Sequence, residues 1–233
     1  MARAVNEKEN AERRREILDA AQRMIYSKGY EAMSVQDLLD ALKISKGAFY
    51  HYYGSKQALL EAFVERLTEE GVRQIAPHVD DPRLGALEKF QKVMSVGMEW
   101  KTGQRDMLLS LMRSWYGEEN LRVRLRANEM GRRAVSPLIA RIVRQGVAEG
   151  VFDTPDTERA ADMFMVLGFA LSEAIVTELL LTPVQGPGDG AARLERVLSA
   201  AAAYAGFYER ILGAPAGSIR LIDPELMRKW TAD

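Results

Sequence analysis

The chain has 233 residues, of which 47% are hydrophobic and 28% charged, and its formal net charge is −1. This composition is typical of a globular protein with one large domain or two unequal ones, and it excludes an intrinsically disordered chain. Cysteine is absent, which excludes disulfides, thiolate metal sites and cysteine nucleophiles. Because the net charge is close to zero, binding to nucleic acid would require a local basic patch.

The sequence gives no signal for secretion or membrane insertion. The N-terminus is charged and lacks the apolar core of a signal peptide. The longest apolar run, Met163 to Leu171, is far shorter than the ~20 residues that span a bilayer. Glu173 and Glu178 interrupt the segment that follows. We therefore expect a cytoplasmic protein without a membrane span.

The first expected helix begins near Arg13, after a loose arm over residues 1–10. A left-handed glycine cap at Gly29 is expected to end this helix. Its apolar residues recur at helical spacing, as Ile17, Leu18, Ala21, Met24 and Ile25.

Three serines mark the starts of the next helices. Ser34 has Asp37 three positions later, which is a capping-box arrangement. Ser45 and Ser55 are expected to cap the two helices that follow. Two short helices separated by about three residues predict a helix-turn-helix unit.

The remaining sequence has helical periodicity divided by Pro and Gly, and no useful strand alternation. Pro82 is expected at the first position of a helix, and Pro137 is expected to kink a long one. The expected helices run from Pro82 to about Trp100, Met107 to near Gly117, Glu119 to Glu149, Pro155 to about Leu181, Ala191 to Leu212 and from Pro224 onward. A Pro/Gly-rich loop is expected at Pro183 to Gly190.

The predicted fold class is all-α, with an N-terminal three-helix helix-turn-helix domain and a larger helical domain. The expected boundaries are 11–72 for the helix-turn-helix domain and 73–233 for the larger helical domain. Within the first domain, residues 41–60 contain three lysines and no acidic residue. This window provides the local basic patch.

The second helix of the motif has two chemically different faces. On a helical wheel, one arc carries Lys46, Gly47, Tyr50 and His51, and the other carries Ala48, Phe49, Tyr52 and Tyr53. Gly47 costs roughly 1 kcal/mol in helix propensity, but it would allow close approach of a phosphate or base edge. For Lys46 or Lys56 alone, a solvated charged face is the better interpretation. The whole arrangement favours DNA binding.

The segment ISKGAFYHYYGSKQALL, residues 44–60, resembles the DNA-binding signature of the TetR (tetracycline repressor) family, and the similarity extends from about Arg13 to Leu67. The resemblance implies that Lys46 to Tyr52 lies in the major groove. It also implies base-edge approach by Gln36, Lys46, Gly47 and Ala48, and phosphate contacts from Ser34, Tyr50, His51, Tyr52 and Lys56.

The sequence departs from the family pattern at Lys43, where the family usually has Gly in the turn. A non-glycine residue with positive φ is strained by about 1 kcal/mol or more. Either the turn bends differently, or Lys43 accepts the strain and supplies a further phosphate contact.

The resemblance also implies a homodimer, in which the last two long helices form a four-helix bundle with their symmetry mates, and a small-molecule cavity. A fully buried helix in a monomer is the alternative for the apolar stretch after Pro155. Candidate cavity residues, each of which could also be ordinary core or rim, are Met94, Met98, Met107, Trp115, Met163, Phe164, Phe169 and Glu173.

We expect no catalytic residues, metal site or cofactor, because the sequence has no Cys, only two His and no phosphate-binding glycine loop. The predicted function is a homodimeric transcriptional repressor that binds a palindromic double-stranded DNA operator and is released by a small-molecule effector. A TetR-like activator or a ligand-independent DNA-binding protein is the alternative. A helical enzyme or carrier of apolar molecules is a remote one.

Overall fold

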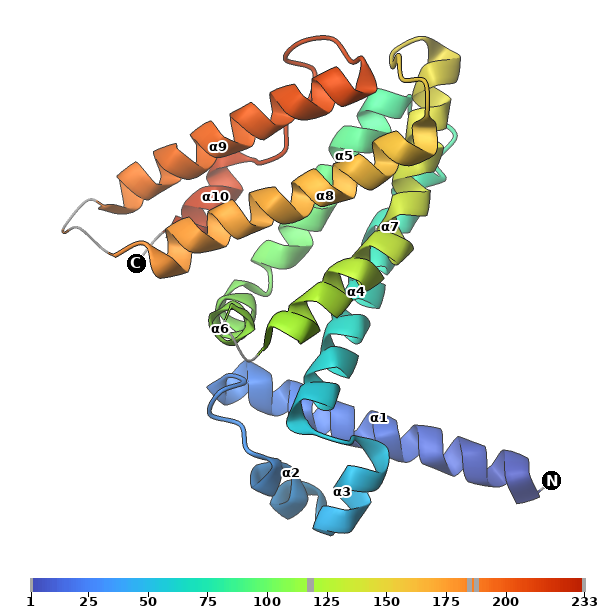
Figure 1. Ribbon diagram of the computed structural model, residues 1–233, viewed down its shortest axis with the longest axis vertical. Helices are drawn as coiled ribbons and strands as arrows, with labels where there is room; N and C mark the ends of the chain where they lie inside the picture. Colours follow the sequence, from blue (N-terminus) through green and yellow to red (C-terminus); the bar gives the residue numbers. More distant parts are fainter. Residues whose placement is uncertain (1, 117–119, 184–185, 187–188, 232–233) are drawn as a thin grey trace. The chain divides into compact units, whose positions relative to one another are not determined.

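Figure 1 shows the computed structural model of the protein, which describes residues 2–116, 120–183, 186 and 189–231. These residues contain helices and connecting segments and no strand, which confirms the expected all-α class. The helices are α1 (Ala2–Lys28), α2 (Val35–Leu42), α3 (Lys46–Tyr52), α4 (Lys56–Val79), α5 (Ala86–Thr102), α6 (Arg105–Trp115), α7 (Leu121–Glu149), α8 (Thr157–Val176), the π-helical turn η2 (Thr177–Leu181), α9 (Asp189–Leu212) and α10 (Pro224–Thr231).

The chain forms two compact units. The first contains residues 1–67 and 106–127, and the second contains residues 68–105 and 128–233. The boundaries therefore fall inside α4, after the first residue of α6 and inside α7, so α6 lies in the N-terminal unit from its second residue on. Residues 106–127 rejoin the first unit, whereas the division expected from the sequence, 11–72 and 73–233, has a single boundary.

In the N-terminal unit, α1 packs against α2 and α3, and α2 packs against α3. Its fully buried side chains include Ile17, Ile25, Leu38, Phe49, Leu59, Leu60 and Phe63. Gly29 has a φ of 82°, which confirms the left-handed cap after α1. An added Cβ at Gly29 would also lie 2.4 Å from the Ser110 hydroxyl oxygen of α6, so this side chain would have to rotate away.

The expectation of a loose arm before Arg13 is wrong, because α1 is helical from Ala2. This first part of the helix is rich in Ala, Glu and Arg, which have high helix propensity, and it contains no Gly or Pro. Lys8 and Glu12 also form an i,i+4 ion pair at 4.0 Å. The segment lacks an apolar stripe, which is why periodicity did not reveal it.

In the C-terminal unit, an aromatic group joins three helices. The ring of Phe164 in α8 lies 5.2 Å from that of Phe90 in α5 and 4.6 Å from that of Tyr208 in α9. Tyr208 donates its hydroxyl hydrogen to the carbonyl oxygen of Phe164 at 3.0 Å. Burial raises the pKa of this phenol. The hydrogen bond satisfies the one polar group in this part of the core.

Helix α5 begins at Ala86, four residues later than expected. Pro82 lies instead in a turn, in which the Asp81 carboxylate accepts hydrogen bonds from the Arg83 backbone and guanidinium at 2.7 to 3.0 Å. The Ala86 N–H donates to Glu149 Oε2 from the end of α7 at 2.8 Å. A carboxylate 63 residues away in sequence therefore caps this helix, and local sequence patterns do not reveal such a cap.

Helices α8 and α9 run side by side (Figure 1). At their corner, Arg193 forms an ion pair with Asp189 at 2.9 Å and donates to the carbonyl oxygens of Leu179 and Thr182. These bonds hold the last carbonyls of η2 against the start of α9. Helix α9 begins at Asp189, inside the expected loop.

Some expected features lie outside the described residues. They are residues 184–185 and 187–188 of that loop, and the helix boundaries expected at Gly117 and Glu119.

The segment Thr157–Leu181 is apolar and long enough, by length and composition alone, to cross a membrane. An apolar helix that packs within a helical protein meets the same criterion, so this finding alone does not make the helix a membrane span. Only 22% of its most apolar window is buried within the chain. Met163 and Val166 of α8 are 45% and 50% exposed. This helix therefore presents an apolar face that the described residues leave uncovered.

Candidate DNA-binding interface

Helices α2 and α3 are both fixed by serine caps. The Ser34 hydroxyl accepts from the Asp37 N–H at 3.1 Å, and Asp37 Oδ2 accepts from the Ser34 N–H at 2.7 Å. This arrangement confirms the expected capping box. The Ser45 hydroxyl accepts from the Ala48 N–H at 3.1 Å, which confirms the cap of α3. Both helix starts are therefore set by local sequence.

The turn between the two helices places Lys43 in the left-handed conformation, with φ 52° and ψ 44°. It is the only non-glycine residue with positive φ in the described part of the chain. The N–H groups of Lys43 and Ile44 both donate to the Leu39 carbonyl, the latter at 3.1 Å, and so close the end of α2. Of the two alternatives for this turn, the structure shows that Lys43 accepts the strained conformation. Its side chain is exposed.

The inner face of α3 is anchored by two aromatic residues. Phe49 is fully buried, and Tyr53 is 3% exposed. Tyr53 donates its hydroxyl hydrogen to the Arg14 carbonyl at 3.0 Å, and the Arg14 guanidinium lies 4.9 Å from the centre of the Tyr53 ring. Burial raises the pKa of the Tyr53 phenol, which keeps the donor protonated. These contacts fix the rotation of α3 on α1.

The opposite face of α3 is exposed to solvent, as expected for Lys46, Gly47, Tyr50 and His51. The Tyr50 ring, 43% exposed, packs edge-on against the buried Phe49 ring at 5.3 Å, which limits its movement. Ala48 and Tyr52, which the resemblance assigns to DNA and the helical wheel assigns to the core, are partly buried. They therefore lie at the boundary between the two faces.

Gly47 is not required by the packing of the chain itself. An added Cβ at this position would meet only the Ser45 hydroxyl oxygen, at 3.9 Å, which is an ordinary contact. The φ angle of Gly47 is also one that any L-residue can adopt. Helix propensity disfavours glycine by roughly 1 kcal/mol, and contacts among the described residues do not account for its presence here.

Two flanking candidates already have partners within the protein. Ser34 donates its hydroxyl hydrogen to Asp37 Oδ2 at 2.8 Å, and the Gln36 amide donates to Asp40 Oδ1 at 2.8 Å. Both side chains remain exposed. To contact DNA, each would exchange an exposed internal hydrogen bond for one to the nucleic acid, which is a small energetic change.

Lys56 is held more firmly than the other lysines of the basic window. Its ammonium group lies 4.3 Å from the centre of the Tyr30 ring and donates to the Glu31 carbonyl at 3.4 Å. Burial lowers the pKa of this ammonium. Lys56 therefore has a structural role in joining α4 to the end of α1, in addition to the phosphate contact that remains a prediction.

The N-terminal half of α1 borders the exposed face of α3. Asn10, Ala11 and Arg14 line a shallow depression of about 370 Å³ together with His51 and Tyr52. The sequence analysis expected a loose arm over residues 1–10 and a helix from near Arg13, so it did not place this part of α1 beside α3.

Comparison with known proteins gives the same assignment. Residues 17–63 match the family model described as bacterial regulatory proteins, tetR family. Over 65 residues, or 28% of this chain and 35% of the relative, the sequence is 40% identical to the HTH-type transcriptional repressor Rv1474c of Mycobacterium tuberculosis. Over 49 residues, or 21% of this chain and 17% of the relative, it is 47% identical to the HTH-type transcriptional regulator YuxN of Bacillus subtilis.

Residues 17–63 of this chain form a DNA-binding segment of the TetR family of bacterial regulators. The aligned segments span only 17% and 35% of these two relatives, so they compare the DNA-binding domain and not the whole proteins. The fold extends further. A transcriptional regulator from Cytophaga hutchinsonii has a TM-score of 0.60 at 16% identity over 85% of this chain and 97% of its own. Escherichia coli NemR in its reduced form has a TM-score of 0.51 at 17% identity, over 87% of this chain and 99% of its own.

The expected effector residues are divided between the two units of the chain. Met107 and Trp115 lie in the N-terminal unit, and the other six lie in the C-terminal unit. Phe164 is in the core, and Phe169 packs next to Gly131 of α7. Met163 and Glu173 are exposed on α8. Met94 and Met98 line a common cavity.

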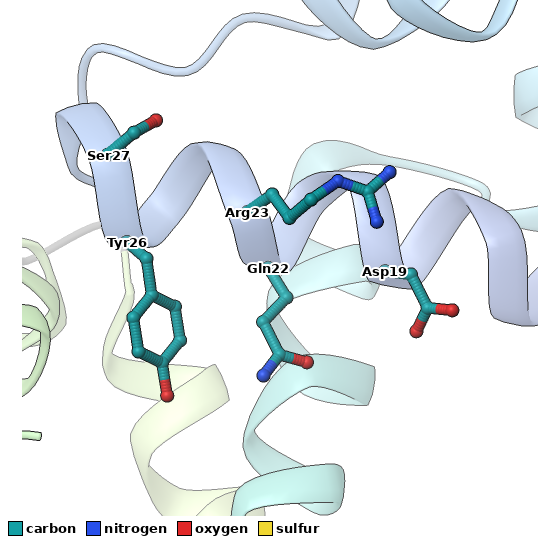
Figure 2. Close-up of a pocket in the computed structure, with 5 residues that line it drawn as sticks. All are labelled: Asp19, Gln22, Arg23, Tyr26 and Ser27. Atoms are coloured by element: carbon teal, nitrogen blue, oxygen red, sulfur yellow. The ribbon is translucent and has the colours of Figure 1, made fainter.

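A shallow depression of about 650 Å³ on α1 was not anticipated from the sequence. Figure 2 shows its lining residues, with Asp19, Gln22 and Tyr26 extending from the same side of the helix. Arg66 of α4 donates to Asp19 Oδ1 at 2.5 Å and to Gln22 Oε1 at 2.9 Å. These contacts within the N-terminal unit explain the polar groups, and we assign no ligand to this surface.

Proposed function

We propose that this TetR-family protein is a transcriptional repressor that binds a palindromic operator as a homodimer and is released by a small molecule. The observation that carries the proposal is the exposed face of α3, where Lys46, Gly47, Tyr50 and His51 are presented on a helix anchored by Phe49 and Tyr53. A rigid helix with this chemistry fits the major groove.

Within this face we assign Lys46, Gly47 and Ala48 to base edges, together with Gln36 of α2. Phosphate contacts are assigned to Ser34, Lys43, Tyr50, His51, Tyr52 and Lys56. The lysine side chains would provide the salt-dependent part of the affinity, and the hydroxyl and imidazole groups would fix the orientation on the duplex.

A dimer is needed because one short helix contacts only a few base pairs, and two copies spaced by one turn of DNA give specificity. We place the dimer surface on α8 and α9. Met163 and Val166 of α8 and Phe207 of α9 are between 45% and 50% exposed, and a second copy of the chain would cover them. A symmetric pairing of α8 and α9 also explains why the apolar helix α8 is so little buried in one chain.

The DNA-binding role supports a cytoplasmic location, because the operator is in that compartment. An activator, or a DNA-binding protein that needs no effector, uses the same interface and is the alternative. Reporter expression in a strain without the gene distinguishes a repressor from an activator. Expression rises if the protein represses and falls if it activates.

Duplex selection with the purified full-length protein tests the proposal. The expected product is a palindrome whose half-sites are separated by about one helical turn of DNA. Lys46→Ala should change the selected bases within each half-site, whereas Lys229→Ala, an exposed lysine of α10, should not. Failure to enrich any sequence, or enrichment of a single unpaired half-site, would contradict the proposal.

A further inference from the structure

A cavity of about 240 Å³ lies between α5 and the segment that leads into α10. Its lining comes from two stretches that are far apart in sequence, namely Gln91, Met94, Ser95 and Met98 of α5 and residues 220–224. All of them belong to the C-terminal unit. The segment after α9 therefore forms one wall of a site, in addition to closing the helical unit.

The wall formed by residues 220–224 is fixed at both ends. After it, α10 packs on α5 and α9, and the Trp230 indole N–H donates to Thr102 Oγ1 at 2.9 Å. Before it, the Ile219 N–H donates to Glu209 Oε1 at 3.0 Å. Ile219, Met227 and Trp230 are all buried. The cavity is therefore preformed and is not a gap in a loose tail.

Gln91, one of the residues that line the cavity, has a hydrogen-bond donor without a partner. Gln91 Nε2 is inaccessible to solvent, and it has no hydrogen-bond partner in the described part of the protein. A wider depression of about 750 Å³ shares Gln91 and Ser95 with the cavity and includes Ser218, whose buried Oγ also has no partner among these residues. Buried polar groups are normally satisfied, so two adjacent exceptions indicate a polar occupant.

One basic and one acidic residue line the cavity, Arg220 and Asp223. Arg220 is exposed. The Asp223 carboxylate already accepts from the N–H groups of Glu225 and Leu226 at 2.7 and 3.2 Å. Glu99 accepts from Ser95 Oγ at 2.8 Å. Arginine and an amide donor without a partner suit a carboxylate.

The rest of the lining is apolar and adaptable. Met94 and Met98 provide flexible thioether side chains, and Leu221 and Ile222 face them from the opposite wall. The volume corresponds to about eight water molecules at ~30 Å³ each, which is below the usual range for drug-sized ligands. A molecule with a short alkyl chain and a single polar head has the required size and polarity.

We propose that this cavity binds a small amphipathic carboxylate, with its head group at Gln91 and Arg220 and its chain between Met94, Met98 and Leu221. Its role as the effector site rests on the proposed regulatory function. The occupation of the cavity does not, because the binding can be measured without DNA. Residues 214–231 then have a function, since they build half of the effector site.

Calorimetric titration of the full-length protein with hexanoate, 1-hexanol and hexylamine tests the site. Hexanoate should bind about tenfold or more tightly than the other two, because only a carboxylate makes charge-assisted bonds to the arginine and amide. Arg220→Gln should remove this preference, and Gln91→Met should reduce it. The matched control is Arg228→Gln, an exposed arginine of α10 outside the lining, which should bind hexanoate like the wild type.

Met94→Trp should fill the cavity and abolish binding of all three compounds, and Leu221→Trp provides a second filling variant from the other wall. Circular dichroism confirms that each variant is folded. Three outcomes would overturn the proposal. They are the absence of hexanoate binding, hexanoate binding that Arg220→Gln and both Trp variants leave unchanged, and a preference for hexylamine. A separate titration of a selected duplex with and without hexanoate tests the effector role. If no duplex binds, the regulatory function fails while the calorimetric result for the cavity still stands.

Discussion

Lys28 Nζ lies 2.7 Å from Asp37 Oδ2, so the last turn of α1 is joined to the first turn of α2 by an ion pair. The same Asp37 carboxylate completes the capping box with Ser34. The orientation of the helix-turn-helix on α1 therefore depends on one carboxylate with three hydrogen bonds. These bonds hold the pKa of Asp37 well below its usual range, and the Lys28 contact is the main cause.

The first prediction concerns the pH dependence of stability. A depressed folded-state pKa stabilises the protein above the unfolded value of about 3.9, and this contribution is lost as the pH falls through the folded-state pKa. Urea unfolding should show Asp37→Asn to be less stable than the wild type at pH 6, with a smaller difference at pH 3. Asp40→Asn is the control, since Asp40 accepts only from the neighbouring Gln36 amide. An equal difference at both pH values for Asp37→Asn would contradict the ionic origin of the effect.

The second prediction separates the backbone of Lys43 from its side chain. Lys43→Gly should relieve the left-handed strain of ~1–2 kcal/mol. Part of this gain, about 0.4–1 kcal/mol, is offset by the greater freedom of glycine in the unfolded chain. A net stabilisation of up to about 1 kcal/mol should appear in denaturant unfolding.

Lys43→Ala is the matched control, because it removes the same amine and keeps the strain. Both variants should lose one predicted phosphate contact in each subunit, which lowers affinity for all sequences and flattens the salt dependence. If both variants keep the wild-type salt dependence, Lys43 does not contact phosphate. If Lys43→Gly is no more stable than Lys43→Ala, the turn is not strained.

The third prediction is that Gly47→Ala stabilises the protein and weakens DNA binding. Alanine should stabilise α3 by about 0.5–1 kcal/mol, because the space around Gly47 is open and its φ is one that alanine can adopt without strain. DNA affinity should fall about tenfold, which is the scale of one lost base contact. Gly97→Ala in α5, where an added Cβ meets nothing within 4 Å, should give a similar stabilisation without the loss of affinity. A Gly47→Ala protein with full affinity would show that DNA does not approach this backbone.

The sequence predicted the features of the fold that depend on near neighbours. The caps at Ser34 and Ser45, and the glycine conformation at Gly29, are each decided within a few residues, and each is present as predicted. The start of α5 was missed because its cap is Glu149, and the turn before it is held by the Asp81–Arg83 pair. Such partners become neighbours only after folding.

The same reasoning explains the uneven result for the site. The exposed and buried faces of α3 follow from helical periodicity, which is local. Met94 and Met98 were among the candidates for the cavity that the family resemblance implies, but the other wall of the cavity they line, residues 220–224, lies more than a hundred positions away. The spacing of residues in the sequence does not show that this segment packs against α5. The approach of Arg220 to Gln91 therefore could not be predicted.

The fourth prediction concerns the dimer surface. Val166→Glu places a charge on the exposed apolar face of α8, where burial against a second copy would be strongly unfavourable. Light scattering should then detect the 26.1 kDa monomer in place of a dimer. Val147→Glu on α7 is the control, because Val147 is 40% exposed and lies outside α8 and α9. Dimers that persist in Val166→Glu but dissociate in Val147→Glu would place the interface elsewhere.

The most direct test of the central claim compares a selected palindromic duplex with the same duplex after one half-site is scrambled. Fluorescence anisotropy with the full-length wild type should show salt-dependent binding to the intact palindrome. Scrambling one half-site should weaken it by a hundredfold or more, since several base pairs at ~1–3 kcal/mol each are lost. Equal affinity for the two duplexes, or affinity that does not change with salt, would contradict binding by two α3 helices of a dimer.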